Sequence, residues 1–428
     1  MHDNLIQQAL QYLPHQLAEL VARVERQANC LGQKAYLVGG IIRDMLLDCP
    51  NCDLDIVVEG DAMLLAREIT KTTEAKTLAS HSRFGTAKLG YKSFIIDLST
   101  ARRESYPERG ALPAVAPGTI EEDLARRDFT INSMAICLSP CHYGELLDPF
   151  DGKEDLEQKL IRILHPQSFQ DDATRILRAI RYEQRLDFRL EKETSRLLKQ
   201  DIPMLDTISG DRLRHELELI FREKYPEKIL NRLDKLNILQ YLSPHLKAGR
   251  RLASNFNKAR LLVSASQLPS LYLCLFIYPL EEEGVKQFTH RFKIPAKQTR
   301  LLIDTVRIKK QMALLSNPCI KNSEVYFLLC NYTLLSIQAN SIASTSEGAR
   351  GALELYLRKL RHIKPVLTGE TLQKLGIPIG PEIGKTLQFL LKEKLDDKAK
   401  TRKQEEQLVL STAKPYRKEG NDLHPPVA

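Results

Sequence analysis

The first 150 or so residues alternate between two kinds of apolar pattern. Short runs rich in β-branched residues, bounded by turn residues, predict strands, and longer segments with apolar residues three or four apart predict helices. The predicted elements are helices over residues 4–29 and Ala62–Thr72, strands over Ala35–Val38 and Leu54–Val58, and a hairpin of Ala87–Leu89 and Phe94–Leu98 around Gly90-Tyr91. Strands mixed with helices in this way indicate an α/β or α+β unit.

The pattern changes near Asp148-Pro149 and is almost only helical from Leu156 onward. The clearest predicted helices are Asp171–Arg185, Asp211–Phe221, Pro226–Leu236 and Ala349–Ile363. Pro365-Val366 and the loop Gly376–Gly384 separate a last helical pair, and the polar stretch Ala413–Ala428 predicts a frayed end.

Length and composition narrow the class of protein. A chain of 428 residues is too long for one compact core. Its formal charge of +9 favours a polyanionic partner through counterion release. The N-terminus lacks the basic start and apolar run of a signal peptide, and no stretch approaches the roughly 20 apolar residues of a membrane span. A cytoplasmic protein is therefore expected.

Four of the eight cysteines form two pairs that are close in the sequence, Cys49 with Cys52 and Cys137 with Cys141. A zinc site would have to combine the pairs, but their separation is not that of a zinc finger and no His-x-x-x-His lies nearby. We expect reduced, partly buried thiols.

A paired-carboxylate motif is the first candidate for chemistry. Asp53 and Asp55 stand two apart on a predicted strand, so their side chains project from the same face. Two carboxylates on one face need a cation between them, and a hard cation such as Mg²⁺ would leave its other positions for phosphate oxygens. Asp97, at the end of another apolar strand, could complete a metal triad. Each acid could instead be an ordinary turn or capping residue.

Glycines and basic residues near this pair suggest a phosphate site. Gly39 and Gly40 follow an apolar strand, where the lack of a Cβ lets backbone N–H groups approach phosphate oxygens. Arg43 lies one turn into the next helix, within reach of the same phosphates. Further along, Arg126 or Arg127 could bind triphosphate, and Asn132 a ribose hydroxyl or a backbone turn. The alternative is a surface salt-bridge cluster.

Four polar residues, Asp172, Arg175, Arg178 and Arg181, recur every three positions and would form one stripe on a helix. An Asp can accept from an exocyclic amino group while an Arg donates to the neighbouring ring nitrogen. Cytosine and adenine offer that pattern, whereas uracil and guanine do not, so the pair Asp172 and Arg175 could select CTP and ATP without a template. The alternative is a salt-bridged solvent face.

Five segments between residues 35 and 222 resemble, in order and spacing, the motifs of the class II tRNA nucleotidyltransferases, a family of CCA-adding enzymes and bacterial poly(A) polymerases within the polymerase β superfamily. These segments are LVGGIIRDMLL with DLDIVV, RRDFTINSMAI, DPFDGKEDLEQKLIRIL, DDATRILRAIRY and GDRLRHELELIF. The stretch TGETLQKLGIPIGPEIGKTLQFLLKEKLDD is similar to a tail segment of several members.

The resemblance implies an α+β fold in which a small mixed-sheet nucleotidyltransferase head precedes an all-helical neck, body and tail. The implied boundaries are 1–30 for an N-terminal helix, 31–150 for the catalytic head, 151–224 for the base-recognising neck, 225–330 for the body and 331–428 for a tRNA-binding tail. Its implied activity is template-independent, Mg²⁺-dependent addition of C and/or A from CTP and ATP to the tRNA 3′ end, with release of pyrophosphate.

The resemblance also implies a role for each candidate residue. The metal-binding carboxylates would be Asp53 and Asp55, with Asp97 as their catalytic companion. The nucleotide would be held by Gly39, Gly40, Arg43, Arg126 or Arg127, Asn132, Asp172, Arg175, Arg178 and Arg181, of which Asp172 and Arg175 would read the base. A neck motif of Asp211, Arg212 and Arg214 would support the base-reading helix.

Two departures from the family pattern leave the product open. The base-reading motif usually begins Glu-Asp and here is Asp171-Asp172, which keeps the reading pair. The segment Ala101–Pro117 resembles that of a branch with both single-step and complete enzymes, so addition of CCA, of CC or of A alone all remain possible. An arginine-rich C-terminal extension would indicate a poly(A) polymerase, and roughly the last 30 residues here are only mildly basic. Loss of Asp53 or Asp55 would indicate a non-catalytic RNA-binding protein, and both residues are present.

Overall fold

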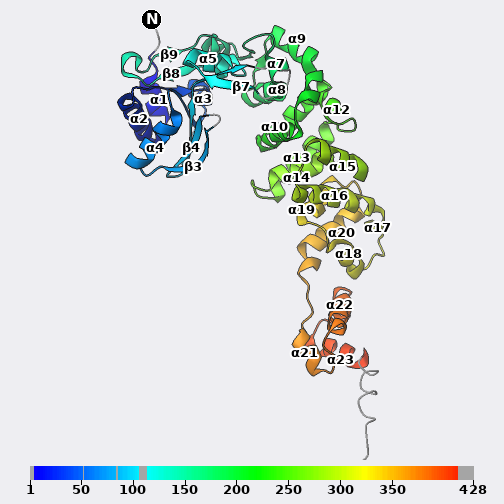
Figure 1. The fold of residues 1–428 in the computed structure, drawn as a ribbon. Coiled ribbons are helices and arrows are strands. Elements are labelled where there is room, and N and C mark those ends of the chain that lie inside the picture. The colour runs from blue at the N-terminus through cyan, green and yellow to red at the C-terminus, as the bar shows by residue number, and fades with distance from the viewer. Residues whose placement is uncertain (1–3, 52, 83–84, 106–112, 413–428) are drawn as a thin grey trace, which may run out of the picture. The chain divides into compact units, whose positions relative to one another are not determined.

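The computed structural model describes residues 4–51, 53–82, 85–105 and 113–412. The chain divides into two compact units, Met1–Leu242 and Ser243–Ala428, and each is described by itself (Figure 1). Cys52, the middle of the segment Ala101–Pro117 and the predicted frayed end Ala413–Ala428 lie outside the described residues.

A seven-stranded mixed sheet forms the centre of the first unit. Its strand order is β3-β4-β5-β2-β1-β8-β9, and within it β2 and β5 are parallel whereas the other neighbours are antiparallel. The strands are β1 (Lys34–Val38), β2 (Leu54–Glu59), β3 (Lys76–His81), β4 (Thr86–Tyr91), β5 (Phe94–Thr100), β8 (Ala135–Cys137) and β9 (Leu146–Leu147). The predicted strands, the pairing of β4 with β5 and the mixed-sheet head are confirmed. The predicted turn at Gly90-Tyr91 was wrong, because both residues pair within β4 and the chain turns at Lys92-Ser93.

Helices cover both faces of this sheet. The helices of the head are α1 (Ile6–Tyr12), α2 (His15–Cys30), α3 (Gly40–Leu46), α4 (Ala62–Thr72) and α5 (Ile120–Ala125), with short 3₁₀ turns η2 (Thr130–Asn132) and η3 (Pro140–His142). Helices α2 and α4 pack together against β1, β4 and β5 (Figure 1). The opposite face has its own apolar cluster, in which Val57 of β2 packs with Ile120 and Leu124 of α5.

The prediction of one helix over residues 4–29 was wrong, because the helix is interrupted at Leu13-Pro14. Proline has no N–H to donate and its ring excludes the preceding turn, so α2 begins anew directly after Pro14. The segment that leaves the sheet after β5 forms a separate hairpin of β6 (Arg102–Ser105) and β7 (Ala114–Pro117).

The remainder of the first unit is mostly helical. Its helices are α6 (Gly152–Glu157), α7 (Ser168–Asp171), α8 (Thr174–Leu186), α9 (Lys192–Asp201), α10 (Gly210–Arg222), α11 (Pro226–Lys235) and α12 (Ile238–Leu242), with the 3₁₀ turn η4 (Ile202–Thr207). The predicted helices Asp211–Phe221 and Pro226–Leu236 are confirmed. The predicted all-helical neck also contains two short parallel strands, β10 (Leu160–Ile161) and β11 (Arg189–Leu190).

The second unit contains only helices among its described residues. They are α13 (Arg250–Leu262), α14 (Leu268–Ile277), α15 (Glu282–Arg291), α16 (Ala296–Lys310), α17 (Met312–Leu315), α18 (Asn322–Leu329), α19 (Leu334–Ala343), α20 (Glu347–Arg358), η5 (Leu360–His362), α21 (Gly369–Lys374), α22 (Pro381–Leu395) and α23 (Arg402–Thr412). Helices α21 to α23 share a small core of their own (Figure 1). In the described parts of the chain, no helix is long and apolar enough to cross a membrane.

Candidate active site

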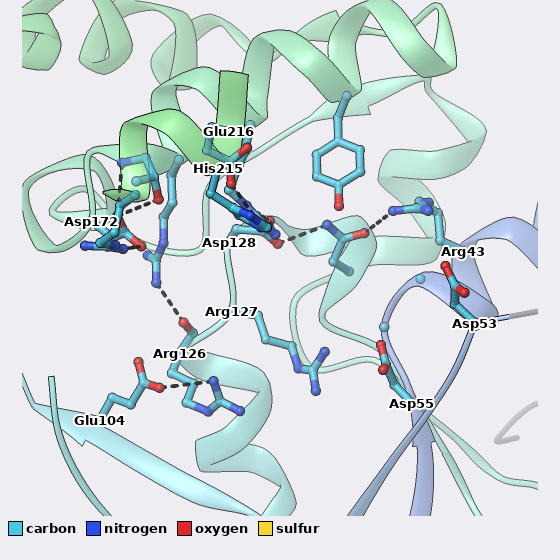
Figure 2. A pocket seen from close by; sticks show the side chains of 18 of the residues that line it. Arg43, Asp53, Asp55, Glu104, Arg126, Arg127, Asp128, Asp172, His215 and Glu216 are labelled. Atoms are coloured by element: carbon cyan, nitrogen blue, oxygen red, sulfur yellow. Dashed lines mark hydrogen bonds and ion pairs between the residues drawn. The ribbon is translucent and has the colours of Figure 1, made fainter. Parts of the chain in front are cut away.

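A cavity of about 910 Å³ opens in the first unit and is lined by the ends of the head strands and by helices α8 and α10 (Figure 2). Most of the residues singled out from the sequence line it: Gly39, Gly40, Arg43, Asp53, Asp55, Arg126, Arg127, Asn132, Asp172, Arg175 and Arg178. Asp97 and Arg181 are not among its lining residues. The cavity therefore brings together the glycine and carboxylate motif, the Arg126-Arg127 motif and the Asp172-Arg175 motif, the first and last of which are more than 100 residues apart in the sequence.

The carboxylate pair lies where β2 enters the sheet. Asp55 shares its face of β2 with Val57, the face that packs on α5. Asp97 of β5 lies directly opposite Asp55 in the parallel register, as predicted for a strand beside the paired carboxylates. The Asp97 carboxylate, however, accepts a hydrogen bond from Lys88 of β4 at 2.9 Å, and this ion pair holds it outside the cavity lining.

The electrostatics of Asp55 favour a cation. Burial raises the pKa of Asp55 to about 6; the Arg127 guanidinium opposes the shift, and the Asp97 and Asp53 carboxylates add to it. A divalent cation would relieve the repulsion among these acids, and carboxylate oxygens are the ligands that Mg²⁺ takes in proteins. Among the described residues, no group of three or more Asp, Glu, His or Cys side chains converges tightly enough to hold a metal. The donor set that fits a metal is thus the pair Asp53 and Asp55, which leaves positions for phosphate oxygens.

The glycine turn is shaped around Arg127. Gly39 has a φ of 74°, in the left-handed region, and a Cβ at this position would lie 2.8 Å from the Arg127 Nη1 atom. Arg127 is also bonded to the buried Asp123 at 3.0 Å, and Figure 2 shows its guanidinium extending toward Asp55. Of the two candidate arginines, Arg127 is the one placed between the glycine turn and the carboxylates.

Arg126 has a different set of contacts. Its guanidinium binds Glu104 of β6 at 3.2 Å (Figure 2). It also binds Asp123 at 2.6 Å, and Glu104 in turn accepts from Arg102. Glu104 and Arg102 line the cavity but were missed from the sequence, because they lie in the segment Ala101–Pro117, whose pattern predicted no regular element. All four residues of β6 are polar, so the alternation of its half-buried and exposed positions leaves no pattern of apolar and polar residues in the sequence.

A chain of buried polar contacts runs beneath the cavity. Arg43 donates to both oxygens of Asp44, at 2.7 and 2.8 Å, and to the Asn132 side-chain oxygen at 2.7 Å. The Asn132 amide donates to Asp128 at 2.9 Å, and Arg178 donates to the other oxygen of Asp128. Burial alone would raise the pKa of Asp128, but the Arg178 charge and the Asn132 amide lower it to about 2. Asn132 and Arg43 are therefore held by protein partners at the cavity wall.

The predicted helix Asp171–Arg185 was wrong at its beginning, and with it the placing of Asp172 on one helical face with Arg175. Helix α8 begins at Thr174, and the Asp172 backbone is extended. The reason is local: the Asp172 Oδ1 atom accepts from the Thr174 N–H at 3.0 Å and from its hydroxyl at 2.6 Å, which ends the preceding turn. The other oxygen, Oδ2, accepts from Arg212 of α10 at 2.6 Å.

Arg175 and Asp172 line the same cavity but do not bond to each other in the contacts described. The Arg175 guanidinium donates to the Ser168 hydroxyl at 2.6 Å and to the Arg126 carbonyl at 2.7 Å, and the residue is 5% exposed. Arg212, named in the neck motif, is the partner of Asp172 instead.

Two arginines of α8 and one of α3 lie around one aromatic ring. The ring is that of Tyr182, a cavity-lining residue also missed from the sequence. The guanidinium carbons of Arg43, Arg178 and Arg181 lie 5.1, 5.9 and 5.0 Å from its centroid. Arg181 is buried and lies within 3.6 Å of Glu216 of α10 and 3.4 Å of Glu223, so it is drawn between the helices and away from the cavity lining. A tyrosine within an arginine-rich helical motif reads as core packing, which is why no sequence signal marked it.

Comparison with known proteins adds to this geometry. Residues 35–162 match the family model of the poly A polymerase head domain, and residues 187–249 match a probable RNA and SrmB-binding site of polymerase A. An A-adding tRNA nucleotidyltransferase of Halalkalibacterium halodurans is 34% identical over 89% of this chain and 88% of its own length. The chain belongs to the tRNA nucleotidyltransferase family.

Two further members of this family extend the comparison. An A-adding tRNA nucleotidyltransferase of Geobacter sulfurreducens is 32% identical over 94% of this chain, and this chain spans about half, 48%, of that relative. A Thermotoga maritima CCA-adding enzyme, solved in complex with tRNA, is 30% identical with a TM-score of 0.75, covering 97% of this chain and 100% of that one. The α+β fold predicted from the sequence is thus shared with nucleotidyltransferases of solved structure.

Proposed function

We propose that this protein is a template-independent tRNA nucleotidyltransferase that adds C and/or A from CTP and ATP to the tRNA 3′ end and releases pyrophosphate. The observation that carries the proposal is that one cavity is lined by the carboxylate pair, by the glycine turn with Arg127, and by Asp172 and Arg175. We further propose that the activity depends on Mg²⁺ and takes place in the cytoplasm.

The residues divide the work by their position in the cavity. Asp53 and Asp55 would hold Mg²⁺, which when bound lowers the cost of activating the tRNA 3′ hydroxyl and of developing charge on the leaving pyrophosphate. Arg127, placed between Gly39 and Asp55, would neutralise triphosphate charge there. Asp97, paired with Lys88, would act on this site only through its charge on Asp55.

Base selection would take place on the neck side of the cavity. Asp172 presents a carboxylate and Arg175 a guanidinium there, the acceptor and donor that an amino group and a ring nitrogen require. Arg178 is a positioning residue in this proposal, because the Asp128 carboxylate binds its guanidinium. Arg181 would brace α8 against α10.

The direct test supplies tRNA ending before CCA, after C, or after CC, each with CTP, ATP or both, and sequences the 3′ ends. We expect added C, A or both on at least one substrate, and no addition when UTP or GTP is supplied in place of CTP and ATP. An enzyme that extends none of the three would contradict the proposal.

Single-step addition of A is the second candidate, because the relatives from Halalkalibacterium halodurans and Geobacter sulfurreducens are both A-adding enzymes. It predicts that only tRNA ending after CC is extended, and only with ATP. A CC-adding enzyme or a poly(A) polymerase is separated in the same experiment, since the first stops after two C residues and the second adds many A residues.

Binding of tRNA should weaken linearly in a plot of log affinity against log salt, with a slope of roughly −0.7 to −0.9 per phosphate contact. We propose the predicted boundaries of the head, neck, body and tail as the functional division. The candidates for phosphate contacts are basic side chains of the ranges Lys247–Arg260, Lys293–Lys310 and Arg350–Lys364. Lys258, Lys297 and Arg300 are exposed there, whereas Lys310 is within 3.5 Å of Glu282.

The salt dependence can be assigned with matched variants. Changing Lys258, Lys297 and Arg300 together to glutamine should reduce the slope, and the single change Lys310→Gln should alter it less, because Glu282 already neutralises that charge. Filter binding over a range of salt concentrations measures both. A slope near zero for the unmodified protein would contradict a phosphate-dominated interface.

Nucleotide addition should decline as the pH falls through about 6, the raised pKa of Asp55. A carboxylate binds a cation only when ionised, so the proton competes for Asp55 below this pH and competition vanishes above it. Rates at limiting Mg²⁺ should show this midpoint, and saturating Mg²⁺ should move it to lower pH. A midpoint that does not depend on Mg²⁺ would assign the titration to another group.

A further inference from the structure

One side chain, Asn51, ties the loop that carries Asp53 to the interior of the head. The Asn51 side-chain oxygen accepts from the Asp53 backbone N–H at 2.8 Å, and its amide donates to Asp44 Oδ2 at 2.7 Å. We propose that Asn51 is a positioning residue that holds Asp53 in its metal-binding place by bridging it to Asp44. This inference rests on the proposed function, in which Asp53 binds the metal.

Asp44 is a fixed anchor for this bridge. It is 2% exposed, and Arg43 donates to both of its oxygens, at 2.7 and 2.8 Å. The Asp44 carbonyl also accepts from the Cys49 N–H at 2.8 Å, so the same residue holds the loop at two points. Movement of the loop would have to break the part-buried bond between Asn51 and Asp44, whose carboxylate lies inside the protein.

An amide suits position 51 because it has both a donor and an acceptor. Its oxygen closes a turn onto Asp53, two residues on, while its nitrogen meets a carboxylate. Aspartate at this position would oppose the Asp44 charge, and alanine would offer neither bond. Asn51 also lies against Gly40, since a Cβ on that glycine would be 3.8 Å from the Asn51 amide nitrogen. The bridge therefore sets Asp53 relative to the glycine turn.

The bridge extends to the base-reading side. Arg43, which binds Asp44, also donates a hydrogen bond to the side-chain oxygen of Asn132, and the Asn132 amide donates to the Asp128 carboxylate. Asp128 in turn holds Arg178 of α8. The backbone N–H of Asp53 is thus linked to helix α8 through a series of side chains, and Asn51 is the first of them on the metal side.

The test measures metal binding without turnover. Mn²⁺ is titrated into the full-length protein with a non-hydrolysable ATP analogue, and free Mn²⁺ is followed by electron paramagnetic resonance. We expect Asn51→Ala to weaken Mn²⁺ binding by about tenfold, the lower end of the loss seen for outer partners of metal ligands. Its tRNA affinity and unfolding temperature should match those of Cys49→Ala, a control in the same loop whose exposed thiol can be removed without touching the backbone contact to Asp44.

Two more variants make the outcomes decisive. Asn51→Ser keeps a hydroxyl acceptor for the Asp53 N–H but is too short to reach Asp44, so we expect it to bind Mn²⁺ as weakly as Asn51→Ala; unimpaired binding in either variant overturns the bridge. Asp53→Ala should abolish tight binding. If Asp53→Ala binds Mn²⁺ normally, the metal assignment in the proposed function fails; if only the Asn51 variants do, the bridge alone fails.

Discussion

Replacing Asp53 or Asp55 with alanine should abolish nucleotide addition, with a loss of roughly 10³-fold or more, because in the proposed function these carboxylates would hold the Mg²⁺ that stabilises the attacking and the leaving oxygen. The two side chains lie at one end of β2 and line the cavity, and burial raises the pKa of Asp55, so that a cation beside it would favour its ionised form. Steady-state rates with CTP and ATP on tRNA lacking part of CCA measure the effect.

Binding of tRNA is the control for this result. It should remain nearly intact in both variants, because the changes remove no basic side chain. A second control is Asp48→Asn, which lies in the preceding loop and keeps a residue type that tolerates the left-handed backbone found there, with a φ of 51°. Activity that survives in the Asp53→Ala, Asp55→Ala double variant would remove the assignment of the catalytic site.

Changing Asp172 to asparagine should relax the rejection of UTP and GTP. The carboxylate can only accept, whereas an amide can also donate to the carbonyl that these bases present. Each unmatched buried polar group costs about 1–3 kcal/mol, so the ratio of correct to incorrect kcat/KM should fall by about tenfold or more. Arg175→Ala should relax the choice as well, but it also removes bonds to Ser168 and to the Arg126 carbonyl, so its overall rate should fall further.

The competing explanation is that Asp172 only braces the neck through Arg212, a bond of 2.6 Å between α10 and the end of α7. The variant Arg212→Ala separates the two. Bracing alone predicts that Arg212→Ala and Asp172→Asn both lower stability and lower all four rates uniformly. Base reading predicts a changed ratio in Asp172→Asn and an unchanged ratio in Arg212→Ala. Measuring kcat/KM for CTP, ATP, UTP and GTP on each variant decides between them, and a constant ratio throughout would make Asp172 structural.

Local pattern was sufficient for elements such as β2 and α4 and for the faces on which their side chains lie. The alternation of Leu54, Ile56 and Val58 with Asp55 and Val57 predicts a strand with its acid on one face, and β2 is that strand. The helix Ala62–Thr72 has the predicted bounds because Asp61 caps its first turn and its apolar side is continuous. Such features depend on residues a few positions apart, so they are encoded in short segments.

The partner of each charged side chain was decided by the tertiary structure. The sequence offered Asp97, Arg43, Asp172 and Arg181 as free ligands, but Lys88, Asp44, Arg212 and Glu216 hold them. Three of these four partners come from other elements, and an ion pair between elements depends on sheet register and helix packing rather than on spacing. The sequence motifs therefore contained most of the residues that line the common cavity, whereas the fold decided the partner of each side chain and placed Asp97 and Arg181 outside the lining.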